Sequence, residues 1–473
     1  MTADLATIAG IDAPTGLLIG GQWCGGRSGM LPVVNPATEG VLVEVADASP
    51  EDGLEAVGAA AAALPRWSAT PPRQRGECLR TAYELMIQRS EQLARLMVCE
   101  NGKALRDARG EIVYAAEFFR WYAEEAVRLD GSVSVAPSGA NRILVVHQPV
   151  GISYMITPWN FPAAMATRKI GPALAAGCTA VLKPAKETPL TALAVAAILA
   201  EAGVPDGVVN VVPTSKPGPM TQAVLADPRV RKLSFTGSTE VGRTLLKQAA
   251  DYVVNCSMEL GGNAPFLVFE DADVDAAVEG AFLAKMRNGG EACTAANRFY
   301  VHEQVAGEFS AKLTARLSAL KVGPGLEDDV ELGPLVNADT RSKVAELVES
   351  ATGDGAKVMT GGHAPDRVGY YYEPTVLDGV PPDAGILSEE IFGPVAPIVR
   401  FTDADQAIAL ANDTEYGLVS YLYCGDLARA LRTAGAGGGH GGYQQGSGVR
   451  SGGAVRRSEA VRPGARRSAR RPA

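Results

Sequence analysis

The chain of 473 residues is too long for one hydrophobic core, so we expect two or three folded units. Its 47% apolar and 21% charged residues are typical of an ordinary soluble globular protein, and no apolar run approaches the length of a membrane span. The net charge of −9 gives no reason to expect a nucleic-acid partner.

The numbers and positions of the cysteines and histidines indicate the cellular compartment and whether a metal site is expected. The seven cysteines are odd in number and have no paired spacing, which favours a reducing, cytoplasmic location over a disulfide framework. The four histidines are not clustered, so we expect no metal site. The N-terminus lacks a basic region followed by an apolar core, and we therefore expect no signal peptide.

The first 150 residues fall into three segments. Residues 1–50 predict short strands, with Leu17–Ile19 and the glycines that follow indicating a hairpin. From about residue 50 to 128, apolar residues recur at spacings of three and four, which predicts helices. Residues 131–149 predict an extended arm, because Ile-Leu-Val-Val at 143–146 is strongly strand-like.

Strands and helices then alternate along the chain. The expected strands are 151–156, 180–182, 208–212 and 230–235, and the expected helices are 164–176, 191–202, 220–226 and 241–250. This order predicts an α/β fold with a parallel sheet covered on both faces, of the kind that binds dinucleotides at the carboxyl ends of its strands. A second alternating region runs from 262 to about 432, with a helix start in the acidic run Asp271-Ala-Asp-Val-Asp275.

A single cysteine, Cys293, follows two glycines and a short polar run. A cysteine thiolate is a strong nucleophile, and glycines let the backbone approach a bound molecule closely. The alternative is that Cys293 is a buried spacer, since free cysteine is among the most buried residue types.

Three further stretches favour the nucleophile: Thr157-Pro-Trp-Asn-Phe-Pro162, Met258-Glu-Leu-Gly-Gly-Asn263 and Glu389-Glu-Ile-Phe-Gly-Pro394. Together with the cysteine stretch, in this order and spacing, they resemble the aldehyde dehydrogenase superfamily, and within it the succinate-semialdehyde dehydrogenases. The resemblance runs from about Gly20 to about Leu431. It implies a Rossmann-type NAD(P)-binding domain (1–130 and 150–261), a β oligomerisation arm (131–149) and an α/β catalytic domain (262–434).

A phosphate site is expected where a strand leads into a helix at Phe235-Thr-Gly-Ser-Thr-Glu-Val-Gly242. The N–H groups and the dipole of a helix N-terminus favour an anion, although a plain strand–helix turn is an equal alternative. The resemblance implies that Ser238, with Gly237 and Gly242 in the same motif, binds the pyrophosphate beside Trp159.

The resemblance also implies the rest of the cofactor site. Lys183 binds the adenosine ribose, and Glu390 and Phe392 hold the nicotinamide ribose and ring. Lys186 stands where many NAD-specific relatives carry a glutamate, and a cation there favours the 2′-phosphate of NADP over NAD. Both cofactors remain open, as does the alternative that Lys186 is an ordinary surface lysine.

The chemistry implied by the resemblance runs through Cys293. Its thiolate adds to the aldehyde, and the side-chain amide of Asn160 with the Cys293 N–H stabilises the oxyanion. Hydride leaves for the nicotinamide, and Glu259 is the base for hydrolysis of the resulting thioester. Lys169 has a supporting role.

Two arginines, Arg168 and Arg287, stand where the resemblance implies a clamp for the distant substrate carboxylate. A guanidinium suits a carboxylate because its planar fork donates two parallel bonds. The expected substrate is a short ω-carboxy aldehyde, either succinate or glutarate semialdehyde. The alternatives are surface salt bridges for both arginines and a dehydrogenase of broader specificity.

The composition changes after Arg432. Residues 437–473 lack Leu, Ile, Met, Phe, Trp and Lys and carry eight arginines against one glutamate. Such a segment cannot bury apolar area to offset its ordering entropy, so we expect 435–473 to be a disordered, aberrant tail. Residues 439–446 and 454–464 can be encoded so that reading one base later gives two C-terminal motifs of the family.

We interpret the tail as the product of a frameshift. The shift would remove part of the catalytic domain and the final strand that pairs with a neighbouring subunit. The homo-oligomer of the family is therefore in question here, and the alternative function is a catalytically impaired cofactor-binding remnant.

Overall fold

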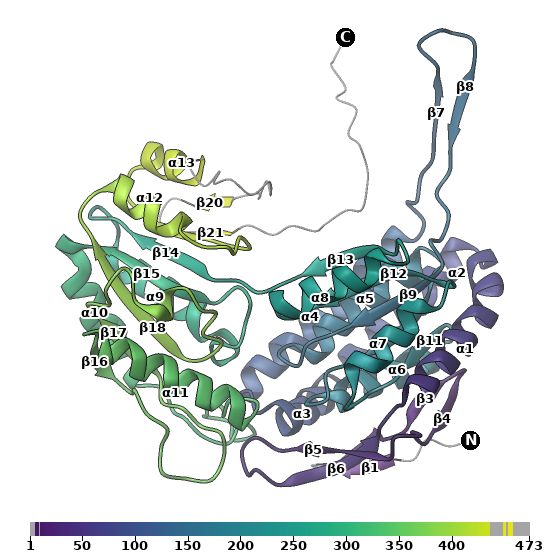
Figure 1. Ribbon diagram of the computed structural model, residues 1–473, viewed down its shortest axis with the longest axis horizontal. Coiled ribbons are helices and arrows are strands. Elements are labelled where there is room, and N and C mark those ends of the chain that lie inside the picture. Colours follow the sequence, from purple (N-terminus) through teal and green to yellow (C-terminus); the bar gives the residue numbers. More distant parts are fainter. Residues whose placement is uncertain (1–4, 9, 436–447, 451–452, 457–473) are drawn as a thin grey trace.

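The computed structural model describes residues 5–8, 10–435, 448–450 and 453–456, which form two sheets side by side, each flanked by helices (Figure 1). The first sheet has the order β13-β12-β9-β10-β11-β3-β4. Its strands are β3 (Leu17–Ile19), β4 (Gln22–Cys24), β9 (Ile152–Ile156), β10 (Thr179–Lys183), β11 (Val209–Val211), β12 (Val230–Thr236) and β13 (Asn255–Glu259). Strands β9 to β13 are parallel and β3–β4 is an antiparallel hairpin, which confirms the parallel sheet and the predicted hairpin.

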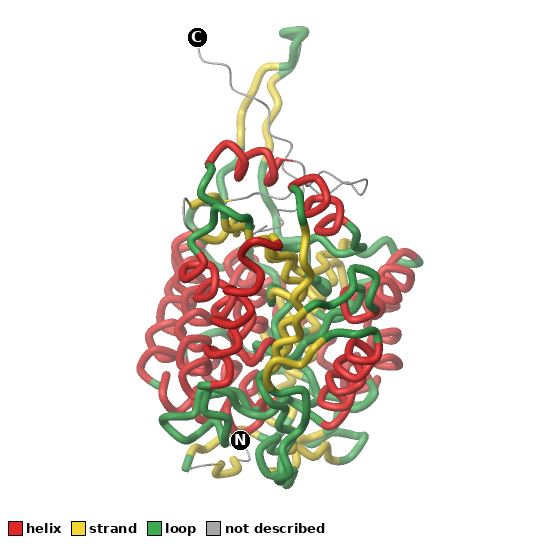
Figure 2. The backbone as a smooth tube through the Cα atoms, turned by 90° about the vertical axis from the view of Figure 1, so that its left-hand side faces the viewer, coloured by secondary structure: helices red, strands yellow, loops and turns green. Residues whose placement is uncertain are grey.

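Helices cover both faces of this sheet. They are α1 (Pro50–Ala69), α2 (Pro72–Gln88), α3 (Ser90–Asn101), α4 (Leu105–Glu125), α5 (Pro162–Ala175), α6 (Pro189–Glu201), α7 (Pro217–Ala226) and α8 (Thr239–Ala250). Along β10, Ala180 and Leu182 enter one apolar core and Val181 enters another, as alternation across a pleated strand requires. Figure 2 shows helices on both sides of the central strands.

The second sheet has the order β16-β17-β18-β15-β14-β19. Its strands are β14 (Ala264–Val268), β15 (Ala296–His302), β16 (Lys357–Thr360), β17 (Thr375–Asp378), β18 (Val395–Phe401) and β19 (Tyr421–Tyr423), all parallel except β16. Its helices are α9 (Val274–Met286), α10 (Glu303–Ser318), α11 (Ala338–Gly353), α12 (Ala404–Asn412) and α13 (Leu427–Gly435), with 3-10 turns η1 (Arg287–Gly290) and η2 (Gly385–Leu387). The helix start expected in the acidic run is confirmed, because Asp273 caps α9.

The chain passes from the first sheet to the second in the short link between β13 and β14. This link contains the predicted boundary between residues 261 and 262, and the division into domains remains our proposal. Among the described residues, four antiparallel pairs lie outside the two sheets, one of them in the tail. The other three are β1 (Leu5–Ile8) with β2 (Ile11–Pro14), β5 (Met30–Val34) with β6 (Val41–Ala46), and β7 (Ser132–Val135) with β8 (Arg142–Val145).

The β7–β8 hairpin projects away from the body of the molecule (Figures 1 and 2). Its apolar side chains are open to water, with Val133 68% and Leu144 72% exposed. It occupies the range expected for the arm.

Most of the tail lies outside the described residues. Within it, β20 (Gly448–Arg450) and β21 (Gly453–Arg456) form an antiparallel pair, and Gly435 ends α13, so the prediction of disorder is wrong for these eight residues. A two-stranded ladder satisfies main-chain N–H and C=O groups without needing large apolar side chains, which is how so polar a segment holds regular structure. The frameshift interpretation is untouched by this pairing.

In the parts of the chain with described coordinates, no helix is both long and apolar enough to cross a bilayer. The same residues contain no group of three His, Cys, Asp or Glu side chains that could hold a metal ion.

Candidate functional site

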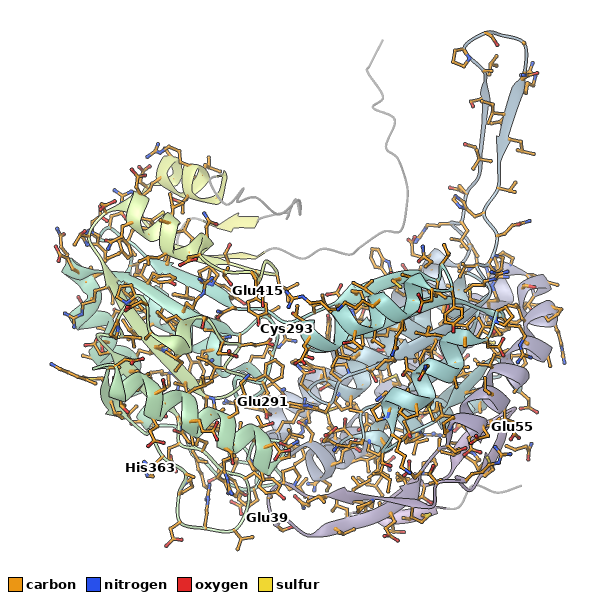
Figure 3. The ribbon with its side chains drawn as sticks, in the orientation of Figure 1. Glu39, Glu55, Glu291, Cys293, His363 and Glu415 are labelled. Carbon is orange, nitrogen blue, oxygen red and sulfur yellow. The ribbon has the colours of Figure 1, made fainter. Side chains whose placement is uncertain are left out.

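Two sets of strand ends meet at the candidate site. In the first sheet, Lys183 pairs with Ile156 and Thr236 with Glu259, so the carboxyl ends of β9, β10, β12 and β13 lie in one row. In the second sheet, the loops that lead into β14, β15 and β18 lie at the amino ends of their strands. Cys293 stands in the loop before β15, and Figure 3 shows it between the two sheets.

Gly262 brings the Glu259 stretch against the Cys293 stretch. A Cβ at Gly262 would lie 2.1 Å from the main-chain oxygen of Cys293, which no side chain can tolerate. The Gly262 N–H donates to Glu390 Oε1 at 3.1 Å. Three of the four sequence motifs therefore converge within a few ångströms.

A left-handed turn makes a second contact between the cysteine loop and the motif at residues 389–394. In η1, Asn288 has φ 54° and Gly290 has φ 82°. A Cβ on Gly290 would lie 2.2 Å from the Gly393 oxygen, so this position requires glycine for both conformation and space. Phe392 also has a positive φ of 56°, which is uncommon for a non-glycine residue and frequent at functional sites.

The Cys293 thiol is held neutral by its surroundings. Burial, followed by the carboxyl groups of Glu390 and Glu259, raises the pKa of Cys293 to about 11, and Arg168 opposes the shift. Burial likewise raises the pKa of Glu390, while the hydrogen bond from Gly262 opposes that rise. The nucleophile thus has to be activated before it reacts, because the thiolate is the attacking species.

Lys169 lies on α5 near the candidate base. Its Nζ donates to Ser234 Oγ at 3.0 Å. Burial lowers the pKa of Lys169 to about 7, while the charge of Glu259 favours the protonated form. The lysine and the carboxylate are therefore electrostatically coupled, in line with a supporting role.

Asn160 lies at the junction between β9 and α5 and is 5% exposed. Its side-chain Nδ2 donates to the Glu291 carbonyl at 3.0 Å. An amide nitrogen carries two hydrogens, so one remains for a substrate oxygen. The amide is thus held next to the loop of Cys293.

The expected phosphate site has the predicted strand–turn–helix form. Ser238 caps α8, and its Oγ accepts from Val241 N at 3.3 Å. The Gly237 N–H donates to the Glu259 carbonyl at 3.1 Å. The neighbouring Thr236 Oγ1 is buried and has no hydrogen-bond partner among the described residues. A helix N-terminus with an unpaired buried hydroxyl fits a bound dinucleotide phosphate.

Lys183 is the last residue of β10, and Lys186 lies three residues beyond it. Burial lowers the pKa of Lys183 to about 8, while Glu187 opposes and Lys186 adds to the shift. The Lys186 side chain is 60% exposed, and its Nζ lies 4.0 Å from Glu187 Oε1. Lys186 is therefore accessible to an anion at the edge of the site.

Trp159 and Phe392 form an aromatic contact between the two sheets. Their ring centroids lie 5.4 Å apart at an interplanar angle of 85°. The Trp159 carbonyl accepts from Asn101 Nδ2 at 3.1 Å and from Thr188 Oγ1 at 3.4 Å. Both predicted cofactor residues therefore sit at the meeting of the two sheets.

Arg168 and Arg287 lie over aromatic rings, and the charge of Arg287 also reaches the Asp107 carboxyl. Arg168 lies over the Phe118 ring, 5.4 Å from its centroid, and Arg287 lies over Phe161 and Tyr114 at 5.2 and 5.9 Å. Neither guanidinium forms an ion pair with any carboxylate that the structure describes. Stacking orients the planar groups and leaves their N–H edges free to donate.

Several residues at the site were missed by sequence reasoning: Lys103, Glu111, Tyr114, Phe118, Asn288 and Glu291. All but Asn288 and Glu291 lie on or just before α4, far from the four motifs in sequence. Glu291 is 2% exposed, and burial raises its pKa to about 8. Glu291 could have been predicted as a site residue, because it stands two residues before Cys293. The residues on α4 could not, because that helix shows only an ordinary amphipathic pattern.

Comparison with known proteins agrees with this geometry. The profile of the aldehyde dehydrogenase family matches residues 23–437. A succinate-semialdehyde dehydrogenase of Paenarthrobacter nicotinovorans is 54% identical over 83% of this chain and 88% of its own. A glutarate-semialdehyde dehydrogenase of Pseudomonas putida is 48% identical over 88% and 86%. The crystal structure of an E. coli NADP-dependent enzyme superposes with a TM-score of 0.88 at 45% identity, covering 94% of this chain and 95% of that one.

Proposed function

Because this chain belongs to the aldehyde dehydrogenase family, we propose that it oxidises succinate semialdehyde, or a similar short ω-carboxy aldehyde, to the acid with NAD(P)+. The substrate class is inferred from the positions of the two guanidinium groups of Arg168 and Arg287. Both lie over aromatic rings beside the cysteine loop, and neither forms an ion pair with a carboxylate in the described part of the chain. A carboxylate on the substrate supplies that partner.

The reacting carbon is attacked by Cys293. Its thiol first loses its proton to solvent water, against burial and the charges of Glu390 and Glu259, which favour the neutral thiol. The sulfur adds to the aldehyde carbon, and the Asn160 amide with the Cys293 N–H holds the developing oxyanion. One such donor is typically worth about 3–4 kcal/mol.

Oxidation leaves a thioester on Cys293, and bound NAD(P)+ supplies the hydride acceptor for that step. Glu259 then takes a proton from water, which attacks the thioester and releases the acid. The charge of Glu259 favours the protonated form of Lys169, which places a cation near the carboxylate that acts as the base. The Glu259 carboxylate therefore acts in the second half of the turnover, when the thioester is hydrolysed.

The carboxylate clamp sets the length of the substrate. Arg287 lies over Tyr114 and Phe161, and Arg168 lies over Phe118, so these rings limit the positions of the two guanidinium groups. Glutarate semialdehyde is one methylene longer, and a pocket discriminates one methylene only weakly, by about 1–3 kcal/mol. The name of the Pseudomonas putida relative supports testing both substrates.

NADP is the favoured cofactor because of Lys186. Its exposed ammonium stands three residues after Lys183, where it can pair with a 2′-phosphate. Glu187 lies beside it at 4.0 Å and partly neutralises that charge, which leaves NAD as the second candidate.

The β7–β8 arm supports a homo-oligomer. Its exposed strands carry unpaired main-chain groups and apolar side chains that a neighbouring subunit would cover. A cytoplasmic location remains our prediction, on the grounds of the scattered, unpaired cysteines.

The proposal is tested by following NADPH absorbance with succinate semialdehyde, glutarate semialdehyde and butanal. We expect kcat/KM for succinate semialdehyde to exceed that for butanal by roughly 100-fold or more, as two charge-assisted bonds imply. Equal values for the charged and uncharged aldehydes would reject the substrate class, and no NADPH or NADH with any aldehyde would reject the reaction.

A further inference from the structure

A buried lysine holds the loop that carries Asn160, although no step of the proposed reaction uses it. Lys103 Nζ donates to the main-chain oxygen of Asn160 at 2.7 Å and to Glu111 Oε2 at 2.6 Å. The side chains of Lys103 and Glu111 are 1% and 0% exposed. The lysine also lies over the Phe161 ring, 4.7 Å from its centroid. Burying such a pair is expensive unless each partner is fully bonded, so the site is closely specified.

The second oxygen of Glu111 fixes the helix that follows. Glu111 Oε1 accepts from the main-chain N–H groups of Ala163 at 2.9 Å and Ala164 at 3.2 Å, in the first turn of α5. A carboxylate at a helix N-terminus also complements the helix dipole. The one ion pair therefore fixes the main chain on both sides of Phe161.

The other face of the loop is tied to the cysteine loop. Asn288 Nδ2 donates to the main-chain oxygens of Asn160 and Glu291, both at 3.0 Å. The Asn160 amide donates to the same Glu291 oxygen at 3.0 Å. The direction of the second Asn160 N–H is thereby set relative to a residue two positions before Cys293.

We propose that Lys103 is a positioning residue for aldehyde oxidation. By holding the Asn160 carbonyl, it aims the free N–H of the Asn160 side chain at the oxygen of the aldehyde bound to Cys293. The inference rests on the proposed function, in which Asn160 stabilises the oxyanion. Its physical basis is that a displacement of 1 Å in a catalytic group can cost about 100-fold in rate.

A double-mutant cycle tests this inference. Lys103→Met, Asn160→Ala and the double variant are prepared in the full chain, and the rate of NADPH formation is measured in a single turnover. We expect Lys103→Met to lower this rate by roughly 10- to 100-fold, with the Kd for NADP+ and the KM for succinate semialdehyde unchanged. In the Asn160→Ala background, Lys103→Met should cause no further loss, because the group that it positions is gone.

Two further variants separate positioning from stability. Arg75 is also a buried cation, and its Nε donates to the Ala175 carbonyl at 3.1 Å, at the opposite end of α5. Arg75→Met should therefore lower the melting temperature without slowing the single turnover. If Lys103→Met alone does not fold, Lys103→Met with Glu111→Gln keeps the amide oxygen for Ala163 and Ala164, removes the unpaired charge and should show the same loss of rate.

The outcomes are distinct. Independent losses that multiply in the double variant would overturn the inference and make Lys103 purely structural, while the proposed reaction would stand. An Asn160→Ala rate equal to that of the parent would overturn both the oxyanion assignment and the role of Lys103. Absence of any oxidation by the parent would reject the proposed function itself.

Discussion

Arg287 stacks on Phe161, with the guanidinium carbon 5.2 Å from the ring centroid. Phe161 follows Asn160 directly in the chain, so the residue that would read the substrate carboxylate packs against the neighbour of the oxyanion donor. The contact therefore places the proposed carboxylate-binding residue next to the proposed oxyanion donor, as a short substrate would require.

Replacement of Arg287 by leucine should affect charged and uncharged aldehydes differently. Loss of a charge-assisted bond costs about 1.5–3 kcal/mol, so KM for succinate semialdehyde should rise roughly 10- to 100-fold. The KM for butanal should change little, because butanal has no carboxylate. Steady-state kinetics with both aldehydes measure the difference.

Arg316 provides a matched control for this variant. It also lies over an aromatic ring, Phe282 at 3.7 Å, but it is paired with Glu279 on the surface of the second sheet's helices. Arg316→Leu should leave both KM values unchanged. An equal loss on both aldehydes in Arg287→Leu would mean that Arg287 supports the fold and does not bind the carboxylate.

Lys186→Glu should shift cofactor preference from NADP to NAD. A carboxylate repels the 2′-phosphate and accepts hydrogen bonds from the free ribose hydroxyls. The measurement is the ratio of the kcat/KM values for NADP and NAD. The control is Lys247→Glu, which changes an exposed lysine in the last turn of α8. If the ratio is the same in parent and variant, Lys186 points away from the nucleotide.

Glu291 should make stability depend on pH. Burial raises its pKa from the ordinary 4.5 to about 8, so the folded chain keeps a proton that the unfolded chain loses above about pH 4.5. The folded state binds more protons between these values, and its stability therefore falls as pH rises through this window.

Glu291→Gln removes this dependence because glutamine does not titrate. The free energy of unfolding of Glu291→Gln, relative to that of the parent, should increase between pH 5 and pH 8 by an amount on the order of 1–3 kcal/mol. Urea unfolding at several pH values measures it, and Glu346→Gln, an exposed glutamate on α11, is the control. A difference between Glu291→Gln and the parent that stays constant with pH would contradict the neutral buried carboxyl.

Restoring the reading frame after about Ala434 should change the assembly. The β7–β8 arm exposes Ile143, Leu144 and Val145, and a C-terminal strand from a neighbouring subunit would cover such an edge. The restored chain should elute as an oligomer in size-exclusion chromatography and turn over faster than the chain as printed. Equal elution and equal turnover of the two would show that the tail is not damage.

The sequence predicted the elements better than their ends. Helices α5, α6 and α7 each begin two or three residues earlier than the apolar pattern suggested, at Pro162, Pro189 and Pro217. Proline suits the first helical position because its missing N–H is not needed there. Strand β13 was not predicted, because apolar and polar residues do not alternate clearly from Asn255 to Glu259. The segment is a strand because it pairs with β12.

Some residues of the candidate site could be predicted from the sequence, and others could not. Residues within the four motifs could be named from their local pattern, and the structure brings Cys293, Glu259 and Asn160 together with both arginines. Lys103 and Glu111 could not be found, because their function depends on the packing of α4 against α5 and not on any local pattern. Long-range packing is the information that a pattern of spacing lacks.

The central claim is that Cys293 carries the substrate as a thioester which Glu259 releases. Glu259→Gln, mixed with succinate semialdehyde and NADP+ and quenched in acid, should accumulate a succinyl group that mass spectrometry locates on the peptide containing Cys293. The Cys293→Ala variant should show neither the adduct nor a burst of NADPH, while still binding NADP+. A burst of NADPH in the Glu259→Gln variant with no succinyl group on Cys293 would contradict the account.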